Sequence, residues 1–280
     1  MSFAKTWAFS RIWLMSAAAV AGLGACTTME ASGPGAMAQM SSGVYAGKSV
    51  LDAAIEAAGG EAALSKVQEV YWTGTAKVTA ADKVTDIGVE TVVRPFQTAR
   101  FASWPAADGP KKARTIQVEQ GKAWDINKTT WSPMPDAQAK NENQQMGLYS
   151  LMLLTPLKSA DATVKEQQAG KDGSRAVQVT YHGQAIEMQF DASGKLVQAA
   201  GAVADPKGGA DIAQVATFSG EVVSNGVKWP QHIAITQNGA PFYEIDITKF
   251  EASPTKVVRP MAQSMQYDQK KVVPGGADAG

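Results

Sequence analysis

The chain has 280 residues, and its 26 Lys and Arg residues balance 26 Asp and Glu residues, so the formal net charge is 0. No segment combines clustered basic residues with stacking aromatic residues, which argues against a nucleic-acid partner. The chain holds one cysteine, which excludes a disulfide within the monomer, so the fold must depend on its apolar core.

The first 26 residues have the layout of an export signal. Two basic residues precede an apolar run over residues 12–21, and this run is shorter than the about 20 residues that a membrane span needs. Residues 23–26, LGAC, then resemble the lipobox of bacterial lipoproteins, in which the chain is cut before the cysteine and the thiol carries a diacylglycerol. We therefore expect residues 1–25 to be a lipoprotein signal peptide and Cys26 to be lipidated. The alternative is a chance cysteine after an ordinary signal peptide.

The residues after the cysteine predict how the protein is placed in the cell envelope. Residues 26–47 are rich in Gly, Ser, Ala and Met, which is typical of a flexible tether behind an acylated cysteine. Thr27 and Thr28 follow Cys26 without an Asp, which resembles the outer-membrane address of enterobacterial lipoproteins. We expect a lipid anchor in the outer membrane, with the protein facing the periplasm. Residues 48–270 then form one β domain, and residues 271–280 a disordered tail.

The domain is predicted to begin with a helix and to continue as antiparallel strands. Ser49 and Asp52 have the spacing of a capping box, and Gly59-Gly60 supplies a stop. Asn225-Gly226 and Asn238-Gly239 are strong hairpin signals, because both central residues of a type I′ turn need a positive φ. Alternation of apolar and polar residues predicts strands within residues 70–78, 87–93, 177–181, 186–190, 229–235 and 243–247.

One segment interrupts the strands. Residues 136–154, DAQAKNENQQMGLYSLMLL, contain strong helix formers, and the second half carries a broad apolar stripe. Thr155-Pro156 ends the pattern, because the residue before a proline disfavours helix. A polar start and an apolar end predict a helix that lies across the sheet.

Three stretches resemble the superfamily of the periplasmic lipoprotein carrier LolA and its receptor LolB. These are AAGGEAALSKVQEVYWTGTAKV, QGKAWDI with the following WSP and helix, and SNGVKWPQHIAITQNGAPFYEIDITKFE, which begin at Ala57, Gln120 and Ser224. The resemblance implies a mainly β (α+β) fold in which a curved antiparallel half-barrel sheet is closed by helices. It also implies that acyl chains are held in a cleft between sheet and helices.

Several large apolar residues of this pattern are candidate ligand contacts, because flexible Met and aromatic side chains suit a lipid tail. An apolar stripe is more often a packed core than a ligand site, so the same residues could simply fill the protein interior. The candidates are Trp72, Trp124, Met146, Tyr149, Met152, Leu153, Phe190 and Trp229.

The sequence favours a binding protein and not an enzyme. His182 and His232 stand apart in different predicted strands, and no Gly-x-Ser-x-Gly nucleophile motif occurs. We expect no cofactor and no metal site. The expected function is non-enzymatic binding of an acyl chain from a lipid or lipoprotein by a lipid-anchored periplasmic protein. The alternative is an accessory outer-membrane lipoprotein that contacts an envelope protein and holds no ligand; an unrecognised hydrolase is a third, weaker hypothesis.

Overall fold

The computed structural model describes residues 44–45, 47–80, 83–127 and 130–256. The predicted signal peptide (1–25), the lipidated Cys26, most of the tether (26–47) and the tail (271–280) lie outside the described residues. Among the helices of the described part, none is long and apolar enough to span a membrane.

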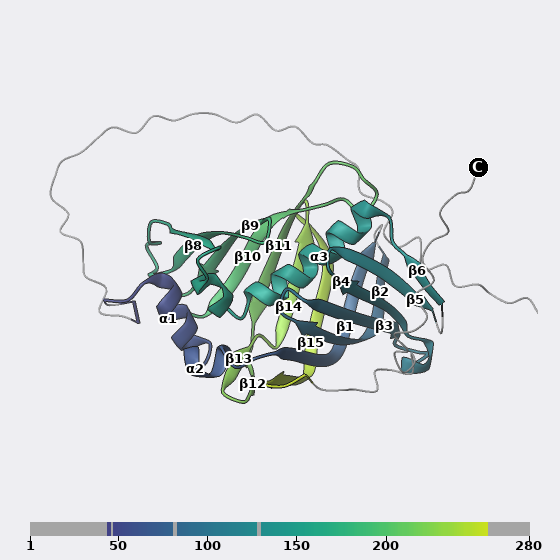
Figure 1. Ribbon diagram of the computed structural model, residues 1–280, viewed down its shortest axis with the longest axis horizontal. Helices are drawn as coiled ribbons and strands as arrows, with labels where there is room; N and C mark the ends of the chain where they lie inside the picture. The colour runs from purple at the N-terminus through teal and green to yellow at the C-terminus, as the bar shows by residue number, and fades with distance from the viewer. Residues whose placement is uncertain (1–43, 46, 81–82, 128–129, 257–280) are drawn as a thin grey trace, which may run out of the picture.

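The described chain is dominated by one antiparallel sheet of thirteen strands (Figure 1). Their order is β6-β5-β4-β3-β2-β1-β15-β14-β11-β10-β9-β8-β7. The strands are β1 (Glu69–Ala80), β2 (Lys83–Arg94), β3 (Thr98–Pro105), β4 (Arg114–Glu119), β5 (Lys122–Asn127), β6 (Thr130–Pro133), β7 (Thr163–Glu166), β8 (Arg175–Tyr181), β9 (Gln184–Phe190), β10 (Leu196–Val203), β11 (Ile212–Ser219), β14 (His232–Gln237) and β15 (Ala240–Ser253). A mainly β chain with a large antiparallel sheet and few helices is therefore confirmed.

Most neighbouring strands are also consecutive in the chain and are joined by tight turns. The turn between β14 and β15 holds Asn238 at φ 49° and Gly239 at φ 80°, as a type I′ hairpin requires. The same pair of angles recurs at Asn225 and Gly226, which join β12 (Val222–Ser224) to β13 (Val227–Trp229) in a separate two-stranded sheet. Both predicted Asn-Gly turns are confirmed.

One predicted strand is divided in the structure. Trp229 ends β13, whereas Ile233 belongs to β14 of the large sheet, so residues 229–235 do not form a single strand. Pro230 lies between the two strands, and a proline has no backbone N–H with which to continue a ladder. The prediction of a single strand over residues 229–235 is therefore wrong.

Helix α1 (Val50–Ala57) begins as the sequence predicts. The hydroxyl of Ser49 accepts a hydrogen bond of 3.0 Å from the backbone N–H of Asp52, which satisfies a free amide of the first turn. Helix α1 packs against β8 with Ala53, Ala54 and Ile55 buried. A short helix α2 (Glu61–Leu64) and two 3-10 turns, η2 (Pro110–Lys112) and η3 (Thr155–Lys158), complete the helical parts of the described chain.

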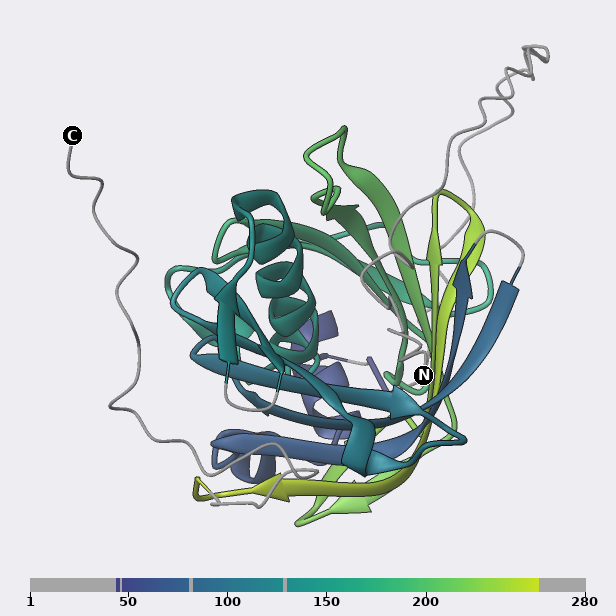
Figure 2. The same cartoon turned by 90° about the vertical axis from the view of Figure 1, so that its right-hand side faces the viewer.

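Helix α3 (Asp136–Leu151) lies inside the bend of the sheet (Figure 2). It contacts β2, β4, β5 and β10. Buried polar side chains fix its position: the hydroxyl of Ser150 accepts a hydrogen bond from the backbone N–H of Phe96 at 3.1 Å, and the amide of Asn141 donates to the carbonyl of Ala204 at 2.7 Å. The helix is thus attached near both of its ends to turns of the sheet.

The apolar core fills the space between the sheet and these helices. Its centre is a chain of aromatic rings in which Trp72 lies 4.9 Å from Tyr149 and 5.9 Å from Trp229, measured between ring centroids. Trp229 stacks on Phe250 at 5.4 Å. These contacts join α3, β1, β13 and β15, so the centre of the core lies against the middle strands of the sheet.

Candidate functional site: a cleft beneath helix α3

A cleft of about 740 Å³ lies between α3 and the inner face of the sheet. Its sheet wall comes from β1–β5, β14 and β15, and its helix wall from α3. The sheet wall is mostly apolar, whereas α3 contributes Glu142, Gln145 and Tyr149. This composition is typical of small-molecule binding clefts.

The sheet wall follows from strand alternation and register. Thr91 on β2 stands opposite Phe101 on β3, and Phe101 stands opposite Ile116 on β4. Residues paired directly across antiparallel strands share a face, so one apolar row crosses three strands. Val89 and Ile87 extend this wall along β2.

The helix wall is formed by one side of α3. Glu142, Gln145 and Tyr149 follow each other at spacings of three and four residues, which places them on one helix face. The Tyr149 ring lies 6.2 Å from the ring of Phe101 across the cleft. On the flank, the amide of Gln145 donates to Oε1 of Gln214 on β11 at 3.0 Å, which links the helix to the sheet.

One end of the cleft is polar. Arg114 on β4 holds Asp125 on β5 through Oδ2, at 2.7 Å from Nη2 and 2.9 Å from Nε. The other carboxylate oxygen of Asp125, Oδ1, is buried and has no hydrogen-bond partner among the described residues. Glu142 lies close enough to this pair for both charges to affect its ionisation.

Glu142 is the most perturbed carboxyl group that lines the cleft. Glu142 is 5% exposed, and its carboxyl group has no hydrogen bond or ion pair with another described residue. Burial raises the pKa of Glu142 to about 7; the charge of Arg114 opposes this shift, and that of Asp125 adds to it. Burial likewise raises the pKa of Tyr149 and Tyr243, so both phenols remain neutral.

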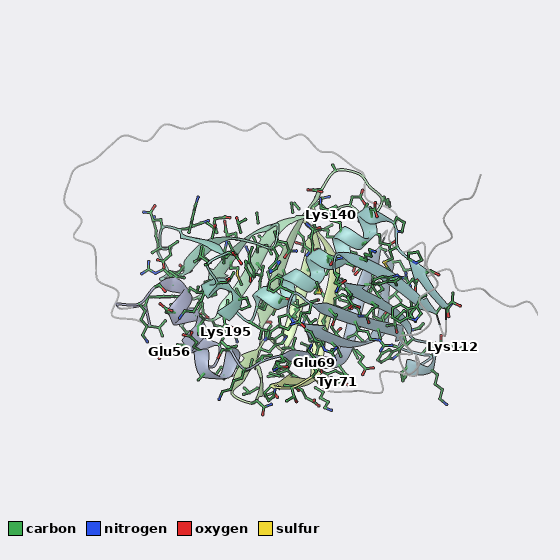
Figure 3. The ribbon with its side chains drawn as sticks, in the orientation of Figure 1. Glu56, Glu69, Tyr71, Lys112, Lys140 and Lys195 are labelled. Carbon is green, nitrogen blue, oxygen red and sulfur yellow. The ribbon has the colours of Figure 1, made fainter. Side chains whose placement is uncertain are left out.

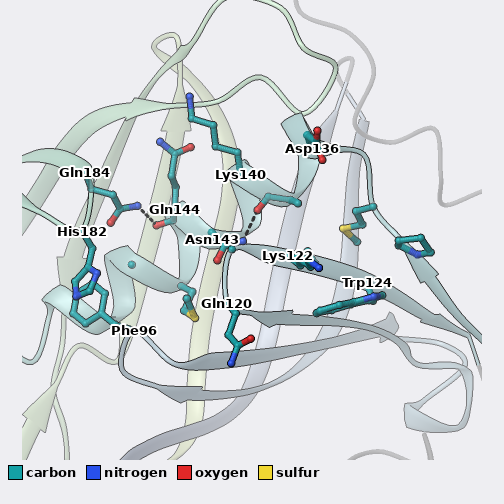
Figure 4. A pocket seen from close by; sticks show the side chains of 18 of the residues that line it. Phe96, Gln120, Lys122, Trp124, Asp136, Lys140, Asn143, Gln144, His182 and Gln184 are labelled. Carbon is teal, nitrogen blue, oxygen red and sulfur yellow. Dashed lines mark hydrogen bonds between the residues drawn. The ribbon is translucent and has the colours of Figure 1, made fainter. Parts of the chain in front are cut away.

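A second hollow, of about 1250 Å³, lies on the other side of α3 (Figure 4). Here polar and apolar side chains are mixed, and the amide of Gln184 in the β8–β9 hairpin donates to the carbonyl of Gln144 on α3 at 2.8 Å. His182, beside Gln184, stacks on Phe96 with ring centroids 4.6 Å apart. We call this region the outer hollow.

The eight predicted contact residues separate into three groups. Trp72 and Tyr149 line the cleft. Trp124 and Met146 line the outer hollow, and Trp124 stands opposite Gln117, so it projects from the sheet face opposite to that of Asp125. The remaining four are buried in the packed core and line neither space: Met152, Leu153, Phe190 and Trp229. The lipidation site, Cys26, lies outside the described residues.

The sequence pattern does not identify the polar residues of the cleft. Glu142 lies in the polar half of its helix, within KNENQQ, so the sequence pattern assigns it to the polar start of the helix and not to a binding site. Its spacing of seven residues from Tyr149 carried the signal, because positions seven apart share a helix face. Arg114 and Asp125 had no sequence signal, since their proximity depends on the pairing of β4 with β5.

Each histidine contacts a neighbouring side chain of the described part of the chain. His232 pairs with Asp246 at 2.9 Å on the surface, and His182 stacks on Phe96. Within the part of the chain that the structure describes, no group of three or more His, Cys, Asp or Glu side chains could hold a metal ion.

No protein-family model and no curated protein matches the sequence. The structure is similar to a LolA superfamily protein from Nitrosomonas europaea, with 8% identity and a TM-score of 0.47 over 69% of this chain and 93% of that chain. It is similar to a putative outer membrane lipoprotein-sorting protein domain from Vibrio parahaemolyticus, with 9% identity and a TM-score of 0.47 over 70% and 90%. A DUF1329 family protein from Desulfovibrio piger gives 11% identity and a TM-score of 0.49 over 73% and 92%. The first of these bears the name of the superfamily that the sequence resembles.

Proposed function

We propose that this protein is a lipid-anchored periplasmic lipoprotein that holds the apolar chain of a lipid or lipoprotein in the cleft beneath α3. In this proposal the bent sheet acts as a half-barrel, and the helices close its open side. Cys26 carries the anchor, which lies in the outer membrane. Binding is non-covalent, and the protein is not an enzyme.

The cleft is the observation that supports this proposal. Its volume of about 740 Å³ lies in the range of roughly 300–1,000 Å³ that is usual for small-molecule sites. Each methylene that moves from water into such a wall contributes about 0.8 kcal/mol. An alkyl chain along the row of Thr91, Phe101 and Ile116 would therefore gain several kcal/mol.

Lipid extraction tests the proposal most directly. The full chain carrying Cys26→Ser, which cannot be acylated at this position, is purified and examined by native mass spectrometry and by solvent extraction. We expect acyl species to co-purify with it. A protein that stays empty, and that takes up no added alkyl compound, would contradict ligand binding.

Two valines provide a matched pair for the cleft itself. Val78 on β1 lines the cleft and is half-buried, whereas Val92 on β2 is half-buried but does not line it. Val78→Gln should lower the affinity for a decyl ligand about tenfold, because it places an amide in an apolar wall, while Val92→Gln should leave it unchanged. Equal effects of the two changes in folded protein would place the ligand elsewhere.

The anchor is tested separately. Labelled palmitate should enter the wild-type protein and not the Cys26→Ser variant. Equal labelling of both proteins would remove the lipoprotein part of the proposal and leave the cleft unaffected.

A second function is supported by the outer hollow. Gln184 has a buried Oε1 without a hydrogen-bond partner among the described residues, so a polar group of another protein could bind there. This would suit an accessory lipoprotein that acts through an envelope partner and holds no ligand. The same extraction experiment separates the two functions, because the accessory protein would remain empty.

A further inference from the structure

Two buried acceptor groups line the same end of the cleft. Glu142 is 5% exposed, and its carboxyl group faces the cleft from α3. Oδ1 of Asp125 is buried on the sheet side and has no hydrogen-bond partner among the described residues. Two basic residues line the cleft: Arg114 is already bound to Oδ2 of Asp125, and Lys112 on η2 is exposed to solvent. The carboxyl group of Glu142 and Oδ1 of Asp125 are thus two hydrogen-bond acceptors at this end of the cleft, and no described residue donates a hydrogen bond to either.

Such an arrangement is costly for a purely structural core. Burial of a carboxylate that has no partner destabilises the folded protein strongly. A buried hydrogen-bond acceptor that has no donor lowers the free energy of unfolding by about 1–3 kcal/mol. An apolar side chain at position 142 would avoid this cost. A ligand that brings donors and a positive charge would satisfy both groups.

We propose, building on the cleft function proposed above, that this end binds a primary ammonium head group whose attached alkyl chain lies along the inner face of the sheet. The N–H groups of such a head would donate to Glu142 and to Oδ1 of Asp125. Its positive charge would balance the carboxylate that Arg114 leaves unpaired. An anionic head group would instead meet two carboxylates.

The geometry also predicts how binding depends on pH. The charged and titratable groups around Glu142 are Arg114 on β4, Asp125 on β5, Tyr149 on α3 and Tyr243 on β15. The pKa of Glu142 is raised to about 7, whereas an alkylammonium stays protonated to about pH 10, like lysine. Affinity for the amine should therefore be highest near pH 8 and should fall below pH 7, as Glu142 gains its proton.

Calorimetry with decyl ligands on the full chain carrying Cys26→Ser tests this inference at pH 8. Decylamine should bind at least about tenfold more tightly than decanol, which offers one donor and no charge. Decyl sulfate should bind more weakly than decanol. Decyltrimethylammonium, a cation without N–H groups, should bind more weakly than decylamine.

Glu142→Gln is the decisive variant, because it keeps the shape of the side chain and removes the charge. It should lower the affinity for decylamine about tenfold and leave that for decanol unchanged. The control is Glu56→Gln, which removes an exposed carboxylate on α1, at the end of the molecule away from Lys112 (Figure 3). It should change neither affinity.

The outcomes separate the two proposals. Equal binding of decylamine and decanol, with no effect of Glu142→Gln, would overturn the ammonium site and leave the hydrophobic cleft in place. Tighter binding of decyl sulfate, or equal binding of decyltrimethylammonium, would also overturn it. Failure of all four ligands to bind would contradict both proposals.

Two natural sources offer the same head group, a free alkylamine and an ethanolamine lipid. Lysophosphatidylethanolamine and lysophosphatidylcholine differ at the nitrogen, so a preference for the first that depends on Glu142 would assign the site to an ethanolamine lipid. Binding of decylamine without such a preference would assign it to a simpler amine.

Discussion

Glu142 shows how one residue can combine a folding cost with a binding role. It lies on the buried face of α3, where its carboxyl group is shielded from water and has Arg114 and Asp125 as its charged neighbours. Because Arg114 is bound to Asp125, its attraction for Glu142 is largely offset. The burial cost therefore dominates, and Glu142 keeps its proton until about pH 7.

This shift makes stability depend on pH. The pKa of Glu142 rises from 4.5 to about 7 on folding, so the folded protein holds a proton that the unfolded chain has already lost. The free energy of unfolding should fall by about 3 kcal/mol between pH 4.5 and pH 7 and change little above it. The free energy of unfolding of Glu142→Gln, measured with denaturant, should not show this fall. The variant should therefore become more stable relative to wild type as the pH rises.

Glu56→Gln serves again as the control, since an exposed carboxyl group has no comparable burial cost. Its unfolding curves should keep the wild-type dependence on pH. Parallel pH profiles of wild type and Glu142→Gln would mean that the carboxyl group of Glu142 is solvated.

The sequence predicts that the cleft has an apolar wall more reliably than it predicts which residues form that wall. The apolar candidates all lie in the interior or beside a hollow, but only Trp72 and Tyr149 line the cleft. A hydrophobic pattern reports burial and does not report which buried side chains face an empty space. Glu142 was missed for the complementary reason, because a charged residue among polar neighbours indicates solvent exposure in most helices.

At the scale of elements, β1 and β15 approach each other closely at a bulge. Their register shifts between Thr73 and Gly74, and a Cβ at position 74 would overlap the backbone carbonyl of Asp246. Backbone atoms of a central strand cannot move aside without disturbing the whole ladder. Glycine is therefore required at this position for close approach.

Gly74→Ala should lower the free energy of unfolding by about 2–3 kcal/mol, the usual cost of overpacking a fixed site. Chemical denaturation followed by tryptophan fluorescence measures the change. The matched control is Gly147→Ala on α3, where the new methyl group meets only the end of the Gln184 side chain. That side chain can rotate, and alanine favours a helix by about 1 kcal/mol, so stability should change little. Similar losses in both variants would show that the bulge is not the cause.

Local signals predict local elements well in this chain. The Ser49 cap, both Asn-Gly turns and the helix before Thr155-Pro156 are found where the sequence places them, because each depends on residues within one turn. The division at Pro230 was missed because alternation continues through the proline. Apolar and polar side chains still alternate across Pro230, although the ladder of backbone hydrogen bonds is interrupted at this residue.

At the scale of the molecule, the alternation of apolar and polar residues does not predict which distant strands pair. Glu69 stands opposite Ser253, and β1 joins β15 in the middle of the sheet. Both strands alternate, and nothing in their alternation selects one partner from the others. The shape of the cleft depends on this long-range pairing. Its polar end depends in addition on the packing of α3 against β4 and β5, which alternation does not show either.

The sheet has two ends among the described strands, β6 and β7, and each strand there has four residues. An edge strand offers unpaired backbone groups to another molecule, and short, charged or proline-containing edges oppose such pairing. Pro133 lies in β6, and the exposed Lys165 lies in β7. These residues oppose the pairing of either edge strand with a strand of another molecule.

Lys165→Val should therefore promote association, because it replaces a charge on the β7 edge with a side chain that favours strand pairing. Light scattering against protein concentration should show a larger mean mass for this variant than for wild type. Lys77→Val makes the same change on the exposed face of β1, whose two backbone edges are already paired with β2 and β15. If both variants associate equally, added surface hydrophobicity explains the effect; association of Lys165→Val alone identifies the free edge of β7 as the surface that the lysine protects.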